Sequence, residues 1–183
     1  MEEEKKTSKP RRSEAFQDLS TLAIVLSVLI LIFVFVARIV IVSGASMEDT
    51  LHNGNAMLVW SLGYKPKQGD IVVLTQTTYQ DDSIVKRVIA TGGQTVDIDY
   101  DAGTVYVDGT ALKEDYIKER MEVPHYGEGL NHITVPEGCI FVMGDNRNHS
   151  ADSRYPAIGI VDERSVIGHV LLVLFPFSAF GTR

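Results

Sequence analysis

The chain begins with a polar segment that is followed by a long apolar one. Residues 1–20 are polar and charged, whereas residues 21–42 read TLAIVLSVLILIFVFVARIVIV and carry one charge, on Arg38. At about 1.5 Å per residue, a helix over this stretch is about 33 Å long, enough to cross a bilayer core of roughly 30 Å. The pattern therefore predicts a single transmembrane helix over residues 21–42.

Two other structures fit an apolar segment of this kind. It can be the core helix of a soluble protein, but such helices are rarely apolar on every face. It can also be a cleaved signal peptide, but the apolar region of a signal peptide is usually ~7–15 residues long. The uninterrupted stretch from Thr21 to Ala37 is longer than that. The sequence therefore favours a membrane span.

Residues 43–183 show the alternation of a β-sheet protein. Short β-branched or aromatic runs are separated by Gly, Pro, Asn or Asp, which predicts a compact, mostly β domain. Asp108-Gly109 predicts a type I′ hairpin, residues 113–121 a short helix, and residues 122–132 a surface loop. The strands are expected at residues 56–60, 70–75, 83–90, 94–99, 104–109, 139–143 and 165–174.

Composition narrows the class of protein. A chain of 183 residues has room for one ordinary domain beside the span. Its net charge is −7, with 24 acidic against 17 basic residues, which argues against a nucleic-acid-binding protein. The single cysteine, Cys139, excludes an intramolecular disulfide, and the scattered histidines form no metal-binding motif. We expect no metal and no other cofactor.

Basic residues near the N-terminus predict the orientation of the span. By the positive-inside rule, in which acidic residues count little, residues 1–20 form a cytoplasmic tail. The catalytic candidates described below then lie outside the cell membrane, in an extracytoplasmic domain over residues 43–183. The basic residues concerned are Lys5, Lys6, Lys9, Arg11 and Arg12.

Three short polar motifs follow the apolar segment. They read SGASMEDTL at residues 43–51, IVKRVI at 84–89 and GDNRNHSADSR at 144–154. Taken singly, a serine beside small residues usually forms a turn, and a lysine in a strand is usually a solvated edge residue. In this order behind a single span, the motifs resemble those of bacterial type I signal peptidases, in the short form of Gram-positive members. These membrane-bound serine proteases remove signal peptides from exported proteins.

The resemblance implies a role for each motif residue. Ser46 is the implied nucleophile and Lys86 the implied general base, and Met47 follows the serine in the nucleophile motif. Ser150 is implied to orient the lysine amine. Four charged residues are implied to hold the site together: Asp145, Arg147, Asp152 and Arg154.

The chain departs from the family pattern at two positions beside Ser46. Asp49 replaces the usual proline of the nucleophile motif. Gly44 stands where some members carry a serine whose hydroxyl contributes to the oxyanion hole. The backbone N–H of Ser46 is therefore the first candidate donor to the oxyanion. The second donor is not identified, since the Ser43 hydroxyl lies one residue further from the site.

Chemistry supports a serine paired with a lysine. A serine hydroxyl needs a general base, and a lysine with its reference pKa of ~10.4 is protonated at neutral pH. Burial among apolar side chains lowers the pKa of a lysine. Lys86 has such neighbours in the sequence, namely Ile84, Val85, Val88 and Ile89.

The expected substrates are exported preproteins that carry signal peptides. Ser46 follows the span closely, so we expect its site near the lipid bilayer and near the secretion channel. An extended substrate can pair with an exposed strand edge, with shallow pockets that accept small residues. The resemblance implies that these residues stand one and three positions before the cut.

Three alternatives remain open. A soluble, self-cleaving protease resembling the repressor class also uses serine and lysine, but it has no membrane span. A non-enzymatic anchored β-domain explains the span and strands but not the three motifs together. A Ser–His–Asp triad built from Asp145, His149 and Ser150 is disfavoured, because adjacent side chains in an extended segment point to opposite faces.

Overall fold

The computed structural model describes residues 11–75, 83–122 and 131–181 of the chain. The described residues belong to two units, one that extends to Val36 and one that comprises Ala37–Arg183. Residues 1–10 of the predicted cytoplasmic tail and most of the predicted loop at 122–132 lie outside the described residues.

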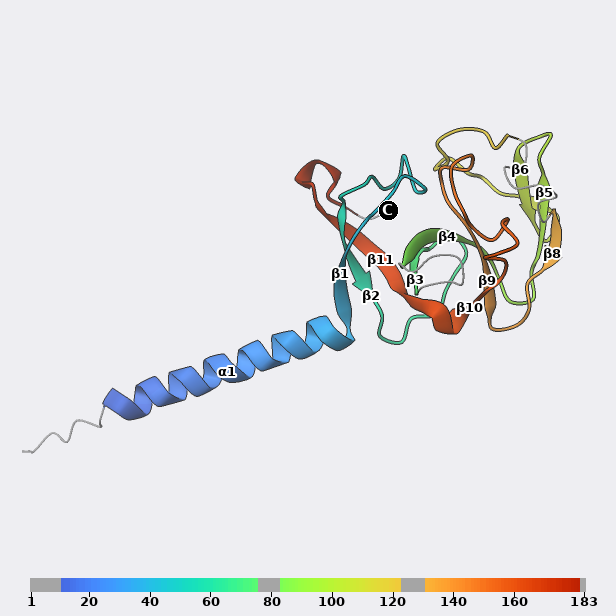
Figure 1. Cartoon of the computed structure of the whole chain (residues 1–183). Helices are drawn as coiled ribbons and strands as arrows, with labels where there is room; N and C mark the ends of the chain where they lie inside the picture. Colours follow the sequence, from blue (N-terminus) through green and yellow to red (C-terminus); the bar gives the residue numbers. More distant parts are fainter. Residues whose placement is uncertain (1–10, 76–82, 123–130, 182–183) are drawn as a thin grey trace, which may run out of the picture. The chain divides into compact units, whose positions relative to one another are not determined.

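The first unit contains helix α1, Arg11–Phe35 (Figure 1). Its segment Glu14–Phe35 has a mean hydropathy of 2.6 and is long and apolar enough to cross a membrane. The helix ends before the predicted boundary at residue 42, because Ala37–Ile41 form strand β1 instead. Isoleucine and valine are frequent in strands, and β1 pairs in register with β2, Ala56–Trp60.

The second unit is built on a seven-stranded antiparallel sheet with the order β1-β2-β11-β3-β4-β9-β10. Strands β2, β3, β4, β9 and β11 confirm the expected positions to within a residue or two, whereas β1 and β10 were not expected from the sequence. The further strands of this sheet are β3 (Ile71–Leu74), β4 (Ile84–Thr91), β9 (Cys139–Met143), β10 (Val161–Asp162) and β11 (Val166–Phe175).

A smaller antiparallel sheet with the order β7-β6-β5-β8 continues from the end of β4 (Figure 1). Its strands are β5 (Thr95–Asp99), β6 (Thr104–Val107), β7 (Thr110–Ala111) and β8 (His132–Thr134). Asp108 and Gly109 both have positive φ, 50° and 75°, which confirms the predicted tight hairpin. Two short 3₁₀ helices, Glu163–Ser165 and Phe177–Ala179, flank β11.

The expected helix at residues 113–121 is not formed. The segment runs in turns and irregular backbone, because several of its polar groups bind residues elsewhere in the chain. Its backbone N–H at Lys118 donates to the Asp145 carbonyl, and its Glu114 carboxylate binds Arg147.

Apolar side chains of the second unit form the core, but one group of them is exposed. Ile41 and Phe175 both pair with Ala56, so they lie on the two strands that flank β2, at the same end of the sheet. We call the exposed side chains around them the apolar corner. Its members are Ile39, Ile41, Phe175, Phe177 and Phe180.

Candidate active site

Ser46 lies in a turn between β1 and β2 that is anchored in the core. The side chains of Met47 and Leu51 are 1% and 0% exposed and belong to one hydrophobic cluster. The N–H of Leu51 donates to the Met47 carbonyl at 2.8 Å, which closes the turn. Met47 therefore anchors the turn in the hydrophobic core, and the adjacent Ser46 remains partly exposed.

Lys86 projects from β4 toward Ser46. Its Nζ lies 2.7 Å from Ser46 Oγ and 3.0 Å from the Val85 carbonyl, and the residue is 3% exposed. Burial lowers the pKa of Lys86 from 10.5 to about 8, although the carboxylates of Asp152 and Asp145 act in the opposite direction. The amine is therefore neutral in a substantial fraction of molecules near pH 8.

The segment 144–154 packs directly on the Ser46 turn. A Cβ at Gly144 would overlap both Ser150 Oγ and the Ser46 carbonyl, so only glycine fits there. Asn146 makes two further contacts with the turn: its backbone N–H donates to the Ser46 carbonyl at 3.1 Å, and its Nδ2 donates to the Ala45 carbonyl at 3.0 Å.

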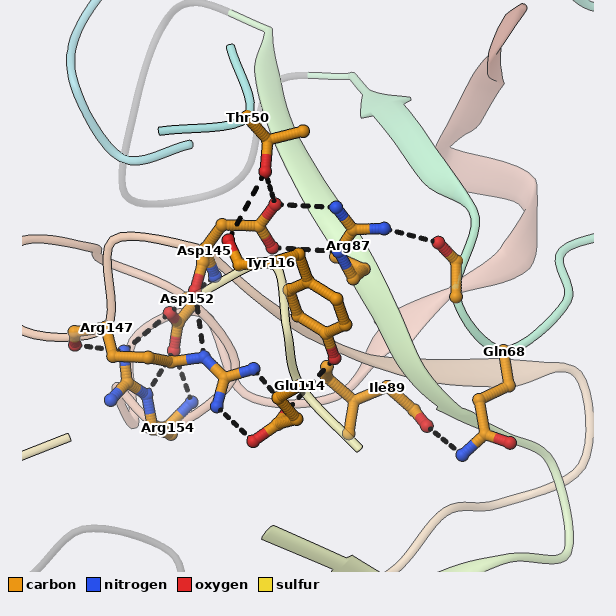
Figure 2. Close-up of polar contacts among 12 residues, drawn as sticks. Thr50, Gln68, Arg87, Ile89, Glu114, Tyr116, Asp145, Arg147, Asp152 and Arg154 are labelled. Carbon is orange, nitrogen blue, oxygen red and sulfur yellow. Dashed lines mark hydrogen bonds and ion pairs between the residues drawn. The ribbon is translucent and has the colours of Figure 1, made fainter. Parts of the chain in front are cut away.

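Asp145 joins all three sequence motifs. Its carboxylate accepts two hydrogen bonds from Arg87, at 2.8 and 2.6 Å, and one from Thr50 at 2.5 Å (Figure 2). Asp145 is fully buried, and Arg87, which follows Lys86 on β4, is 6% exposed. These charge-assisted hydrogen bonds tie the nucleophile turn to the lysine strand.

Arg147 is held by a residue that sequence reasoning missed. The guanidinium is fully buried and binds both oxygens of Glu114, at 2.9 and 2.5 Å. Tyr116 donates its hydroxyl to Glu114 at 2.9 Å, and its ring centre lies 4.0 Å from the Arg87 guanidinium carbon (Figure 2). Residues 113–121 carry charges of both signs, a pattern that does not indicate that Glu114 faces the site.

Asp152 and Arg154 form a third ion pair in the same segment. Arg154 binds both carboxylate oxygens of Asp152 at 2.8 Å and donates to the Arg147 carbonyl at 2.7 Å. Burial alone would raise the pKa of Asp152, but Arg154 and the Gly144 N–H outweigh burial and keep the pKa below its usual value. The segment therefore keeps a fixed set of charges beside Lys86.

Ser150 lies beside Gly144, close to the turn that carries Ser46. Its Oγ is buried and helps to lower the pKa of Asp152, but it has no partner with good hydrogen-bond geometry within the part of the chain that the structure describes. A hydrogen bond between this hydroxyl and the Lys86 amine is therefore not formed among the described residues, and the orienting role of Ser150 stays a prediction.

Ser46 and Lys86 open into a cleft. One wall consists of Val40, Ile41 and residues 43–46, and the other of residues 83–86, with His149 and Ala151 also lining it. Within the described residues, the outer edge of β1 and the start of β4, on its β9 side, bear no neighbouring strand of the large sheet. Two strand edges therefore border the cleft.

The backbone N–H of Ser46 is a candidate donor beside the cleft. The N–H of Ser46 makes no hydrogen bond among the described residues, whereas Gly44 N–H donates to Asn53 Oδ1 at 3.1 Å. Gly44 has a φ of +96°, a conformation that side-chain-bearing residues rarely adopt. Among residues 11–75, 83–122 and 131–181, no group of His, Cys, Asp and Glu could hold a metal ion.

Comparisons with known proteins agree on one family. The family model "Signal peptidase, peptidase S26" matches residues 15–175. A Synechocystis protein described as "Probable signal peptidase I-1" is 38% identical over 90% of this chain and 85% of its own length. Signal peptidase I of Bacillus licheniformis is 37% identical over 97% of both chains. A crystal structure of a signal peptidase I from Enterococcus faecalis, 33% identical, covers 58% of this chain and 97% of its own, with a TM-score of 0.46.

Proposed function

Because the chain belongs to the signal peptidase family, peptidase S26, we propose that it cleaves signal peptides with Ser46 as nucleophile and Lys86 as general base. The family membership makes it a signal-peptide-cleaving serine peptidase. The observation that carries the residue assignment is the 2.7 Å separation between Ser46 Oγ and the buried Lys86 Nζ. The two alternative functions do not explain the family match. A soluble self-cleaving protease does not explain the apolar helix, and a non-enzymatic anchored domain does not explain the Ser46–Lys86 pair.

The reaction follows from these groups. The neutral amine of Lys86 accepts the Ser46 hydroxyl proton while Oγ attacks the scissile carbonyl carbon. The carbonyl oxygen becomes an oxyanion that accepts a hydrogen bond from the Ser46 N–H. The ammonium of Lys86 then gives its proton to the leaving amine, which leaves an ester on Ser46. Water, deprotonated by the same amine, attacks the ester carbonyl, and the Lys86 ammonium returns this proton to Ser46 Oγ as the carboxylic acid product leaves.

The cleft supports an extended substrate. A peptide lying between β1 and the start of β4 can form backbone hydrogen bonds with either edge, which gives affinity with little demand on sequence. Gly44 and Ala45 line the cleft beside Ser46, where the side chains next to the cut would lie. The substrates proposed are exported preproteins with signal peptides.

The membrane arrangement is part of the proposal. Residues 1–20 form a cytoplasmic tail, and the apolar part of α1 that follows them spans the lipid bilayer. The β-domain, which begins at Ala37, then works outside the cytoplasm near the secretion channel. The support is the apolar character of α1 and the basic residues that precede it.

Cleavage of a synthetic signal-peptide substrate by the detergent-solubilised full chain tests the assignment. Ser46→Ala and Lys86→Ala should each abolish turnover, and so should Lys86→Arg, because a guanidinium stays protonated. The matched control is His149→Ala, which removes an exposed side chain from the same cleft and should retain most of the activity. Loss of activity in His149→Ala with survival of Lys86→Ala would overturn the pair.

A further inference from the structure

Asn146 holds the backbone on both sides of Ser46. Its side-chain Nδ2 donates to the carbonyl of Ala45 at 3.0 Å, and its backbone N–H donates to the carbonyl of Ser46 at 3.1 Å. These two carbonyls belong to the peptide groups that precede and follow Ser46. Asn146 is 2% exposed, so water does not replace either bond readily.

Peptide planarity turns the first of these bonds into a constraint on the Ser46 N–H. In a trans peptide the carbonyl oxygen and the next N–H point in opposite directions. Fixing the Ala45 carbonyl therefore fixes the direction of the Ser46 N–H, which has no hydrogen-bond partner among the described residues. A hydrogen bond accepted by the carbonyl also polarises the peptide group and makes its N–H a better donor.

We propose that Asn146 is a positioning residue of the oxyanion hole, which aims the Ser46 N–H at the developing oxyanion through the Ala45 carbonyl. This inference rests on the proposed role of Ser46 as nucleophile. Its weight is greater in this chain because Gly44 supplies no hydroxyl as a second donor. The N–H of Glu48 also donates to the Ala45 carbonyl, at 3.2 Å, so Asn146 shares the task.

The Asn146 side chain is poorly explained by stability alone. Its Oδ1 is buried and has no hydrogen-bond partner within the described residues, and an unpaired buried carbonyl destabilises a fold. An amide is also uncharged, so it can support an oxyanion site without repelling the negative charge that forms there. An aspartate of the same shape would lose the donor and add that repulsion.

The test compares Asn146→Ala and the nearly isosteric Asn146→Asp with the wild-type full chain. Removing a direct oxyanion donor costs about 10²–10³ in kcat, and misdirecting one should cost roughly ten- to hundredfold. KM should change little, because the contact acts in the transition state. A peptide aldehyde that forms a tetrahedral adduct with Ser46 should lose affinity by a similar factor. The same peptide with a methylene in place of the scissile carbonyl forms no oxyanion, so the Asn146 variants should bind it as tightly as the wild type does.

Asn148→Ala is the matched control. Asn148 is a buried amide in the same segment, but it binds Glu119, Arg120 and the Glu122 N–H, away from Ser46. Asn148→Ala should lower the melting temperature at least as much as Asn146→Ala. It should leave kcat within about twofold of wild type, since Asn148 touches no group that acts in the transition state.

The outcomes separate this inference from the proposed function. If both Asn146 variants keep wild-type kcat, or if both ligands lose affinity equally, the positioning role is wrong. If Asn146→Ala fails to fold, Asn146→Asp carries the test alone. If Ser46→Ala still cleaves the substrate, or the aldehyde does not modify Ser46, the proposed function itself is wrong.

Discussion

Lys86 is buried, which disfavours its charged form, so the rate of cleavage should depend on the protonation of its amine. Because burial lowers its pKa to about 8, kcat/KM should rise with pH through an apparent pKa near 8 as the amine becomes neutral. A pH–rate profile of the solubilised wild type measures this. A plateau that is already complete below pH 6, or a rise only near ~10.4, would contradict the role of Lys86 as base.

The same burial should cost stability. Between the folded-state pKa of about 8 and the unfolded value of 10.5, the unfolded chain binds more protons at this side chain, so stability rises with pH across that interval. At pH 7 the cost is fully present, and Lys86→Met should stabilise the inactive protein by about 1–3 kcal/mol. Thermal unfolding measures the difference. Lys67→Met, at an exposed position, should give no such gain.

Gly144 should not tolerate even one added methyl group. In Gly144→Ala the Cβ overlaps the Ser150 hydroxyl and the Ser46 carbonyl, so the nucleophile turn must move. We expect the free energy of unfolding to fall by about 1–3 kcal/mol and kcat/KM to fall roughly tenfold or more. Gly168→Ala overlaps the Trp60 carbonyl, away from the cleft, and should destabilise without the fall in rate. Equal rates for the two variants would refute the argument.

Which residues form the site was only partly predictable from sequence. Ser46 and Lys86 stand in recognisable motifs, and the structure brings their side chains together, although their catalytic roles stay predictions. Glu114 and Tyr116 were not predictable, because a buried ion pair between distant segments leaves no local pattern. The direction of the Asn146 amide is likewise fixed by tertiary contacts with Ala45 and Ser46.

Among the elements, the segment 113–121, which carries Glu114, should stabilise the segment 144–154 that packs on the Ser46 turn. Glu114→Ala leaves the buried Arg147 guanidinium without its carboxylate, which should cost about 3–5 kcal/mol. Adding Arg147→Met should restore much of that stability, as a double-mutant cycle by denaturant unfolding would show. Lys113→Ala breaks the neighbouring exposed pair with Asp115 and should change little. A similar loss for both single variants would contradict the prediction.

The strands were largely predictable, and the exceptions have physical causes. Alternating runs such as 56–60 and 139–143 became β2 and β9 at the expected residues. β1 was hidden because its residues continue the apolar run of α1, and hydropathy does not separate a strand from a helix there. The helix expected at 113–121 failed because contacts with Asp145 and Arg147 outweigh a weak local preference.

For the whole molecule, the proposed orientation makes opposite ends accessible from opposite sides. Protease added to intact cells or spheroplasts should degrade the β-domain but spare a tag placed before residue 1. The physical reason is that basic residues are retained on the cytoplasmic side. Permeabilised cells, in which both ends should be cut, are the control. A degraded N-terminal tag with a protected β-domain would show that the orientation is inverted.

The apolar corner has a consequence for handling the protein in the laboratory. A fragment that starts at Ala37 lacks α1 but keeps Ile39, Ile41, Phe175, Phe177 and Phe180 exposed. Contiguous exposed apolar surface promotes association in water. Such a fragment should therefore self-associate in detergent-free buffer, as light scattering would detect. Phe177→Ser together with Phe180→Ser should yield a monodisperse preparation suited to crystallisation and inhibitor screening.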